Sequence, residues 1–232
     1  VKSYLRYAQQ ASWGVVVSGG GQVAVDASGK LAVAPALEAV HVWSIKQRTL
    51  VRTLRAPDGG GHEVTALELG ADGDTLAVGH ADGTVRVWRL GDGSERVVLT
   101  GHKGAVTSLQ LSAGCERLVS CSNDRSVVLW DVVAEAGICR LRGHHDAVTD
   151  ATLLGGAGGA LASVGKDGQL KLWDLHTQHC VQSVAAPSGE LWSVAVDADG
   201  RRLLTGGKGA EVILWSLETR QVLAGAGGVV DA

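Results

Sequence analysis

Five tryptophans recur along the chain at almost constant intervals, and this repeat constrains the fold more than any other feature. The intervals are 45, 42, 43 and 42 residues. A constant period of about 20–50 residues is typical of chains built from one supersecondary unit that is repeated. The tryptophans of the series are Trp43, Trp88, Trp130, Trp173 and Trp215.

Each of these tryptophans ends a short β-like run in which apolar residues dominate both faces. The runs are residues 39–43, 84–88, 126–130, 169–173 and 211–215. A strand that is apolar on both faces is expected where other sheets cover it on each side. Trp13 and Trp192 lie outside the series and open the runs 13–17 and 191–196. We predict that these two runs are inner strands of the first and fifth units.

Two further markers follow the tryptophan period. Asp82, Asp124 and Asp167 each precede their tryptophan by six residues and lie in short turn-like segments. Asp-Gly between two strand-like runs, as in the second and fourth units, is a strong signal for a β-hairpin. Gly-His pairs at 101–102 and 143–144 precede their tryptophans by 28 and 29 residues, counted from the histidine.

The period near 42, the Gly-His starts and the Trp-Asp pairs at 130–131 and 173–174 resemble the WD-repeat family over nearly the whole chain. The resemblance implies an all-β fold in which each repeat forms a four-stranded antiparallel blade of a β-propeller. Because a blade with two apolar faces can bury neither alone, neighbouring blades must stabilise one another. We expect a single propeller domain over residues 1–232. Its five blades are expected near residues 10–58, 59–100, 101–142, 143–186 and 187–226.

Five units are fewer than the seven that are usual in this family. We therefore expect an incomplete, open propeller, or a truncated product, with one blade face uncovered. Such an edge would favour aggregation.

Two units each combine serine, histidine, aspartate and tryptophan, and these residues allow two interpretations. One is the triad of a hydrolase. The other is the hydrogen-bonded tetrad that ties a WD blade together. We favour the tetrad, because the groups recur in successive units and buried polar groups must be paired. The tetrads are His102, Ser120, Asp124 and Trp130 in the third unit, and His144, Ser163, Asp167 and Trp173 in the fourth.

The remaining units lack parts of the tetrad. Val78 takes the serine position in the second unit, and Leu37 takes the aspartate position in the first. The fifth unit has Thr205 at the serine position but Gly209 at the aspartate position. We therefore expect the third and fourth blades to be the most rigid part of the molecule.

Other chemical signals are weak. Residues 206–209 lack the leading glycine and the following Ser or Thr of a phosphate-binding loop, and a turn is the better interpretation. His144–His145, and the pair His176 and His179, have no carboxylate or cysteine partner that would suggest a metal site. Neighbours on a strand such as His179 and Cys180 point to opposite faces and do not form a nucleophile–base pair. We expect no catalytic residue, no cofactor and no metal.

Composition narrows the class of protein further. Hydrophobic residues make up 45% of the chain, which argues against disorder. The first seven residues lack the apolar core of a signal peptide, and no stretch is long and apolar enough for a membrane span. Four scattered cysteines without a CxxC pair indicate a reducing compartment. The formal net charge of −3 gives no overall signal for nucleic acid.

A basic cluster nevertheless stands out in the outer part of the first unit. It could face phosphate groups of RNA, or it could be solvated edge-strand charge that prevents unwanted strand pairing. We favour the second interpretation and retain the first as a candidate contact with RNA or a partner. The cluster consists of Lys46, Arg48, Arg52 and Arg55.

Several segments are more specific than generic WD repeats. They resemble the tandem-propeller WD proteins of the UTP-B module of the small-subunit processome, and this resemblance implies that the chain is part of a longer protein with two propellers in tandem. The resemblance implies a non-catalytic nucleolar scaffold that assembles with other WD propellers on pre-rRNA and snoRNA for 18S rRNA maturation, without a membrane or small-molecule partner. A generic WD adaptor in ubiquitin ligation or signalling is the alternative, and an enzyme ranks third. The segments are residues 1–18, 36–46, 76–83, 101–107, 128–137 and 174–180.

Overall fold

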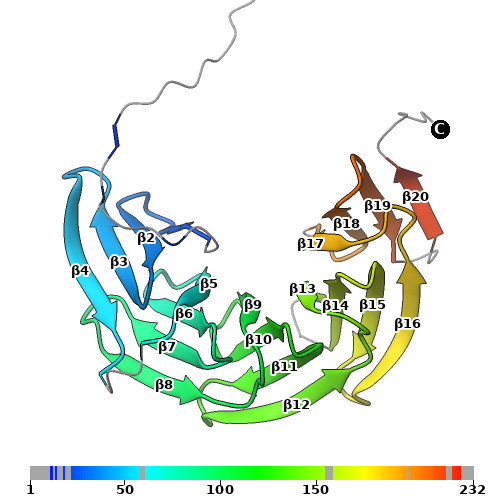
Figure 1. Ribbon diagram of the computed structural model, residues 1–232, viewed down its shortest axis with the longest axis horizontal. Helices are drawn as coiled ribbons and strands as arrows, with labels where there is room; N and C mark the ends of the chain where they lie inside the picture. The colour runs from blue at the N-terminus through cyan, green and yellow to red at the C-terminus, as the bar shows by residue number, and fades with distance from the viewer. Residues whose placement is uncertain are drawn as a thin grey trace, which may run out of the picture.

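The computed structural model is an open arc of five four-stranded antiparallel sheets that fan around a common centre (Figure 1). It describes residues 11–12, 14, 18, 22–57, 61–154, 159–197 and 199–217, and the backbone of 221–225. Within each sheet the strands follow one another in chain order, with the first strand innermost. The prediction of an all-β propeller of about five blades that does not close is confirmed.

We number the sheets along the chain. Sheet 1 contains β1 (Ala24–Val25), β2 (Leu31–Ala36), β3 (Ala39–Ser44) and β4 (Thr49–Arg55). Sheet 2 contains β5 (Val64–Leu69), β6 (Thr75–His80), β7 (Val85–Arg89) and β8 (Glu95–Leu99). Sheet 3 contains β9 (Val106–Leu111), β10 (Arg117–Ser122), β11 (Ser126–Asp131) and β12 (Ala136–Arg142). Sheet 4 contains β13 (Val148–Leu154), β14 (Ala160–Gly165), β15 (Gln169–Asp174) and β16 (His179–Ala185). Sheet 5 contains β17 (Leu191–Val196), β18 (Arg202–Gly207), β19 (Val212–Ser216) and β20 (Gln221–Gly225).

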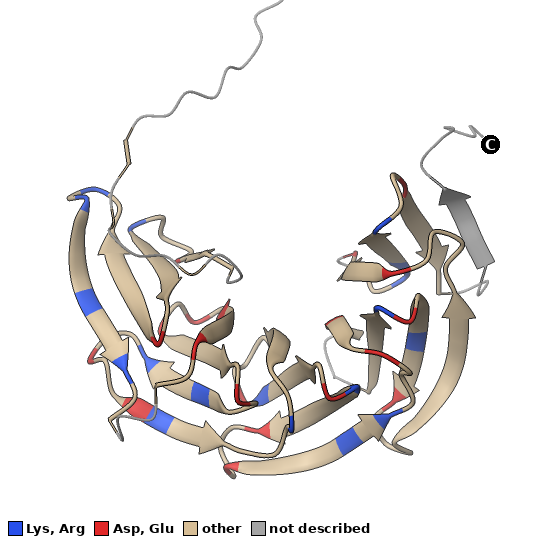
Figure 2. Cartoon of the chain, viewed as in Figure 1, with Lys and Arg blue, Asp and Glu red and all other residues tan. Residues whose placement is uncertain are grey.

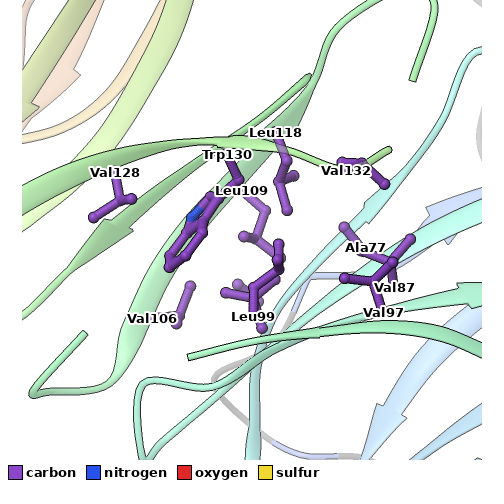
Figure 3. Packing of buried hydrophobic residues seen from close by; sticks show 12 residues of the cluster. Ala77, Val87, Val97, Leu99, Val106, Leu109, Leu118, Val128, Trp130 and Val132 are labelled. Atoms are coloured by element: carbon purple, nitrogen blue, oxygen red, sulfur yellow. The ribbon is translucent and has the colours of Figure 1, made fainter. Parts of the chain in front are cut away.

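The hydrophobic core lies between the sheets, in four clusters that each draw side chains from two neighbours. Strand β11 shows how one sheet serves two clusters. Val128 and Trp130 pack toward sheet 2, whereas Val127 and Leu129 on the opposite face pack toward sheet 4. Figure 3 shows the first of these clusters, in which Trp130 of sheet 3 lies among apolar side chains of both sheets. The apolar character of both strand faces therefore has the predicted cause.

The periodic tryptophans fill these junctions. Trp88, Trp130, Trp173 and Trp215 are 2–5% exposed and lie against the preceding sheet. The prediction of a strand over 191–196 is confirmed as β17, the inner strand of sheet 5. The run 13–17, which was predicted to be the inner strand of the first unit, lies largely outside the described residues, and β1 (Ala24–Val25) is the inner strand of sheet 1.

The turns between the second and third strands follow the sequence signals. The turns at Asp82 and Asp167 continue through Gly83 (φ 90°) and Gly168 (φ 70°). Glycine is required at the first position, because a Cβ there would lie 2.8 Å from the carbonyl oxygen of His102. Arg125 adopts the same left-handed conformation (φ 69°) in sheet 3.

Threonines on the inner strands bind neighbouring sheets together. At three junctions the second residue of the inner strand donates its hydroxyl proton to the first carbonyl of the next inner strand. Trp192 occupies the equivalent position in sheet 5 and is 54% exposed. The three bonds run from Thr65 to Val106 (2.6 Å), from Thr107 to Val148 (2.5 Å) and from Thr149 to Leu191 (2.7 Å).

Within the described part of the chain, no other sheet covers one apolar face of sheet 5. Leu204 and Val212 are 46% and 50% exposed on that face. The residues at the same two positions of sheets 2–4 are at most 3% exposed, because the next sheet covers them. These equivalents are Ala77, Val119 and Ala162 for the first position, and Val85, Val127 and Leu170 for the second. No helix in the described part of the chain has the length and apolar character that crossing a bilayer requires.

We predict that the open face of sheet 5 causes self-association of this chain. Replacing Leu204 and Val212 by threonine, which suits β-strands, should shift the sedimentation profile of concentrated protein toward the monomer. Because both side chains are exposed, the free energy of unfolding should change by no more than about 0.5 kcal/mol.

The matched control replaces Leu50 and Val51 by threonine. These substitutions also remove one leucine and one valine side chain, but the two residues are exposed on the outer strand β4. An equal reduction of self-association by this control would contradict a role for the face of sheet 5.

Candidate functional site

The structure joins the tetrad residues of the third unit into one hydrogen-bonded chain. His102 lies in the connection from β8 to β9, Ser120 on β10, Asp124 in the turn after β10, and Trp130 on β11. Trp130 Nε1 donates to Ser120 Oγ at 2.8 Å, and Ser120 Oγ lies 2.7 Å from His102 Nε2. His102 Nδ1 lies 3.0 Å from Asp124 Oδ2.

Sheet 4 repeats this arrangement. Trp173 Nε1 donates to Ser163 Oγ at 2.8 Å, and Ser163 Oγ lies 2.8 Å from His144 Nε2. His144 Nδ1 lies 3.0 Å from Asp167 Oδ2. The carboxylate also accepts the backbone N–H of His145, so the tetrad holds the connection from β12 to β13 in place.

The hydrogen bonds of a tetrad all run in one direction, from the tryptophan to the aspartate. The indole can only donate, so it donates to the serine, whose hydroxyl donates to Nε2 of the histidine. Nδ1–H of the neutral imidazole then donates to the carboxylate. Burial lowers the pKa of His102 and of His144 despite the nearby aspartates, which agrees with neutral rings.

The aspartates of the tetrads are ionised. Burial alone would raise the pKa of the Asp124 carboxyl. Hydrogen bonds from Ser126, from the N–H of Lys103 and from His102 outweigh that effect and hold the pKa well below its usual range. The same balance of burial and hydrogen bonds lowers the pKa of Asp167.

Arg140 and Ser126 extend the tetrad of sheet 3 and were missed by sequence reasoning. Arg140 Nη1 lies 3.3 Å from Asp124 Oδ2, and Nη2 donates to the carbonyl of Gly101 at 2.6 Å. Ser126 Oγ donates to Asp124 Oδ1 at 2.6 Å. The position of Arg140, 16 residues after Asp124 on the outer strand, gives no local signal for this contact.

The two tetrad serines have no exposed surface at all. Ser120 and Ser163 are each engaged by an indole and an imidazole, so neither hydroxyl is open to a substrate. The geometry is that of an internal tie rather than of an attacking nucleophile. The described residues also contain no group of three or more His, Cys, Asp or Glu side chains placed to hold a metal ion.

The other sheets have shorter polar ties. In sheet 5, Trp215 Nε1 donates to Thr205 Oγ1 at 2.8 Å. In sheet 2, His62 Nε2 lies 3.6 Å from Asp82 Oδ2, and the buried Val78 occupies the serine position. Leu37 in the turn of sheet 1 has φ of 56° and is exposed.

The basic cluster of the first unit is divided between two environments. Lys46, Arg48 and Arg55 are exposed at and along the outer strand β4 (Figure 2). Arg52 turns toward sheet 2, where its Nη1 donates to the carbonyl of Leu90 at 3.0 Å. One of the four cations is therefore used to join two sheets.

Two carboxyl groups on the inner strands, those of Glu68 and Asp150, influence each other. Asp150 on β13 bridges three sheets, because its carboxylate accepts Ser108 Oγ of β9 at 2.7 Å and the N–H of Val194 of β17 at 3.0 Å. Burial raises the pKa of Glu68 on β5 to about 7, and the charge of Asp150 adds to this shift. Gln110 occupies the position equivalent to Glu68 in sheet 3.

We predict that a complete tetrad stabilises its sheet more than the two-residue tie of sheet 5. Ser120→Ala leaves the Trp130 indole N–H and the His102 Nε2 without their hydrogen-bond partner, which should cost about 2 kcal/mol. Thr205→Val leaves only the Trp215 indole without one and should cost about 1 kcal/mol. Urea unfolding of both variants measures the difference, and an equal or larger loss for Thr205→Val would contradict it.

We predict that Glu68 destabilises the protein as the pH rises through 7. A carboxyl whose folded pKa is raised contributes stability that is present below its unfolded pKa near 4.5 and is lost above about 7. Glu68→Gln should therefore match the unchanged chain at pH near 4.5 and exceed it above pH 7, by on the order of 1–2 kcal/mol.

Thermal unfolding across this pH range measures the effect. Glu63→Gln is the control, because it removes an exposed carboxylate just before the same strand. A pH profile of Glu68→Gln that parallels the unchanged chain at every pH would show that the carboxyl is not held protonated.

Comparisons with known proteins agree with this geometry. A family model described as the WDR3 first β-propeller domain matches residues 30–217. U3 small nucleolar RNA-associated protein 12 of Saccharomyces cerevisiae is 39% identical over 217 residues, which cover 86% of this chain and 23% of the yeast protein. A WD repeat-containing protein 3 homolog of Dictyostelium discoideum is 34% identical over 106 residues, or 46% of this chain and 11% of that protein.

A more distant relative is the pre-mRNA-splicing factor cwf17 of Schizosaccharomyces pombe, which is 29% identical over 75% of this chain and 52% of its own length. The chain spans less than a quarter of the length of the yeast and Dictyostelium relatives. The family match includes both tetrads and all the strands from β2 to β19. The chain belongs to the WD-repeat family and, within it, to the family of the WDR3 first β-propeller domain.

Proposed function

We propose that this chain is a non-catalytic scaffold module of ribosome assembly. In this role it would help to assemble the small-subunit processome on pre-rRNA and snoRNA in the nucleolus, for maturation of 18S rRNA. Its partners would include other WD propellers of the UTP-B module, and it would be one part of a longer protein with two propellers in tandem.

One observation carries the scaffold role. The residues that resemble catalytic sets lie inside the sheets, where indoles and backbone amides use their polar atoms. The surface that remains consists of turns and outer strands on a framework of buried junctions. Loops on a rigid framework of this kind are suited to binding partners.

The comparisons support the choice of ribosome assembly. The yeast relative that covers 86% of this chain is named for its association with U3 small nucleolar RNA. The family model that matches is also a specific first-propeller model and not a general WD repeat.

A generic adaptor role is the second candidate, and a specific observation favours it. The splicing factor cwf17 shares 29% identity over 75% of the chain, so much of the sequence is common to WD proteins of different complexes. The same framework could therefore present its loops to a complex unrelated to ribosomes.

Purification of the tagged protein from its own cells distinguishes the two candidates. We expect sequencing of the bound RNA to show enrichment of pre-rRNA and U3 snoRNA, and mass spectrometry to identify other WD propeller proteins. The control is a tagged WD-repeat splicing factor purified in the same way. Equal enrichment of these RNAs with both baits, or of spliceosomal RNAs with this protein, would contradict the proposed function.

A further inference from the structure

One side of sheets 3 and 4 carries four exposed cations that have no side-chain partner among the described residues. We name this side the turn face. It comprises the connections from β8 to β9 and from β12 to β13, and the turns between β10 and β11 and between β14 and β15. The four cations are Lys103, Arg125, Arg142 and Lys166.

Backbone hydrogen bonds and strand pairing fix the positions of these four residues on the turn face. The N–H of Lys103 donates to Asp124 Oδ2 at 2.9 Å, and Arg125 follows Asp124 in the same turn. Arg142 is directly opposite Ser126 in the pairing of β11 with β12. Lys103 and Arg125 are therefore fixed beside Asp124 through the backbone, and Arg142 lies opposite the first residue of β11.

The fourth cation is anchored in sheet 4 by a bond between backbone groups. The N–H of Lys166 donates to the carbonyl of Ala147 at 2.9 Å, next to the connection that Asp167 holds through His145. The backbones of these residues are thus fixed before a ligand binds, which lowers the entropy cost of binding.

The acidic groups of this face leave the four cations available. Asp124 and Asp167 have side-chain exposures of only 10% and 6%, and histidines and backbone amides already occupy them. The guanidinium group of Arg140 further offsets the negative charge of Asp124. Asp146 is the exposed carboxylate of the face, and it accepts the N–H of Ala147.

The opposite side of the same two sheets has the reverse charge. Its described connections carry four carboxylates, and Arg117 at the start of β10 is the cation beside them. Sheets 3 and 4 therefore have a positive and a negative side. The four carboxylates are Glu116, Asp131, Glu135 and Asp174.

The chemistry of the turn face favours a phosphodiester backbone over an acidic protein. Protein interfaces usually have an apolar or aromatic centre. The exposed large hydrophobic residues of the described chain lie elsewhere, for example Val98, Ile138 and Val181 on outer strands and Val133 on the opposite side. Contacts between cations and phosphates need no such centre and can supply the affinity for RNA alone.

We propose that the turn face of sheets 3 and 4 binds the phosphate backbone of single-stranded RNA through Lys103, Arg125, Arg142 and Lys166. This inference rests on the proposed function and names a contact surface for it. It replaces the cluster on sheet 1 as the main RNA surface, because one of those four cations is engaged by Leu90.

The test measures the affinity of the full chain for a labelled oligouridylate as a function of salt. The turn-face variant carries Lys103→Gln, Arg125→Asn, Arg142→Gln and Lys166→Gln; asparagine suits the left-handed backbone at position 125. The control variant carries Lys30→Gln, Lys46→Gln, Arg48→Asn and Arg55→Gln, which again removes two lysines and two arginines. Its Arg48 likewise has a left-handed backbone.

Four phosphate contacts correspond to a salt slope of about −2.8, so the affinity of the unchanged chain should fall at least about 50-fold between about 50 and about 200 mM salt. The turn-face variant should bind more weakly at low salt, and the magnitude of its salt slope should be smaller by about 2.8. The control should behave like the unchanged chain. Should the turn-face variant unfold, Lys103→Gln with Lys166→Gln changes two exposed side chains only and should lose about half of that slope.

Three results would overturn the inference. The first is equal loss in the turn-face and control variants, and the second is an unchanged slope in a folded turn-face variant. The third is a labelled polyglutamate that binds as tightly as the oligouridylate and is lost in the same variant, which would assign the face to acidic proteins. Failure of U3 snoRNA to co-purify from cells is a separate result, because it contradicts the proposed function and leaves oligouridylate binding by this face unaffected.

Discussion

The structure depends on one constraint, which is that every sheet between the two ends of the arc is apolar on both faces. Strand β11 contributes alternate residues to the clusters on either side of sheet 3, so removing either neighbour would expose half of its core residues to water. Sheets 2, 3 and 4 are thus stabilised from two directions, and sheet 5 has one face without a covering sheet. Stability in such an array is a sum over neighbours, so the middle sheets are held most firmly.

The tetrads follow from the same constraint. A junction filled by a tryptophan also buries an indole N–H, and that donor needs an acceptor. Ser120 accepts this hydrogen bond and donates its own hydroxyl hydrogen to His102. The imidazole donates to Asp124, whose carboxylate also accepts hydrogen bonds from the N–H groups of Lys103 and Ser126. Burial of one aromatic ring is in this way linked to the geometry of a surface turn. In sheet 5 the chain of bonds from the indole reaches Thr205, and Gly209 stands where an aspartate would be.

The sequence predicts the parts of this structure that are encoded locally. The tryptophan period predicts the number of sheets, and the Asp-Gly pairs at 82–83 and 167–168 predict two turns. Glu135 and Gln178 adopt the left-handed conformation that usually marks a glycine, so the turns before β12 and β16 give no comparable signal. The inter-sheet bonds depend on how sheets meet, and only the recurrence of Val-Thr at 64–65, 106–107 and 148–149 could have suggested them. Asp150 gives no such signal, because its partners lie 42 and 44 residues away.

Which charged side chains already form internal hydrogen bonds also decides where the surface can bind a ligand. Cations that close a gap between strands or sheets, such as Arg52 and Arg140, have their guanidinium groups occupied by carbonyls or carboxylates. Cations that are fixed only through their backbones, such as Lys103 and Lys166, keep their ammonium groups in solvent. A free charge on a rigid backbone loses only side-chain entropy on binding, whereas an engaged charge must first break its internal bonds. Net charge therefore conceals where binding can occur, and a chain with a formal charge of −3 can still present a cationic side.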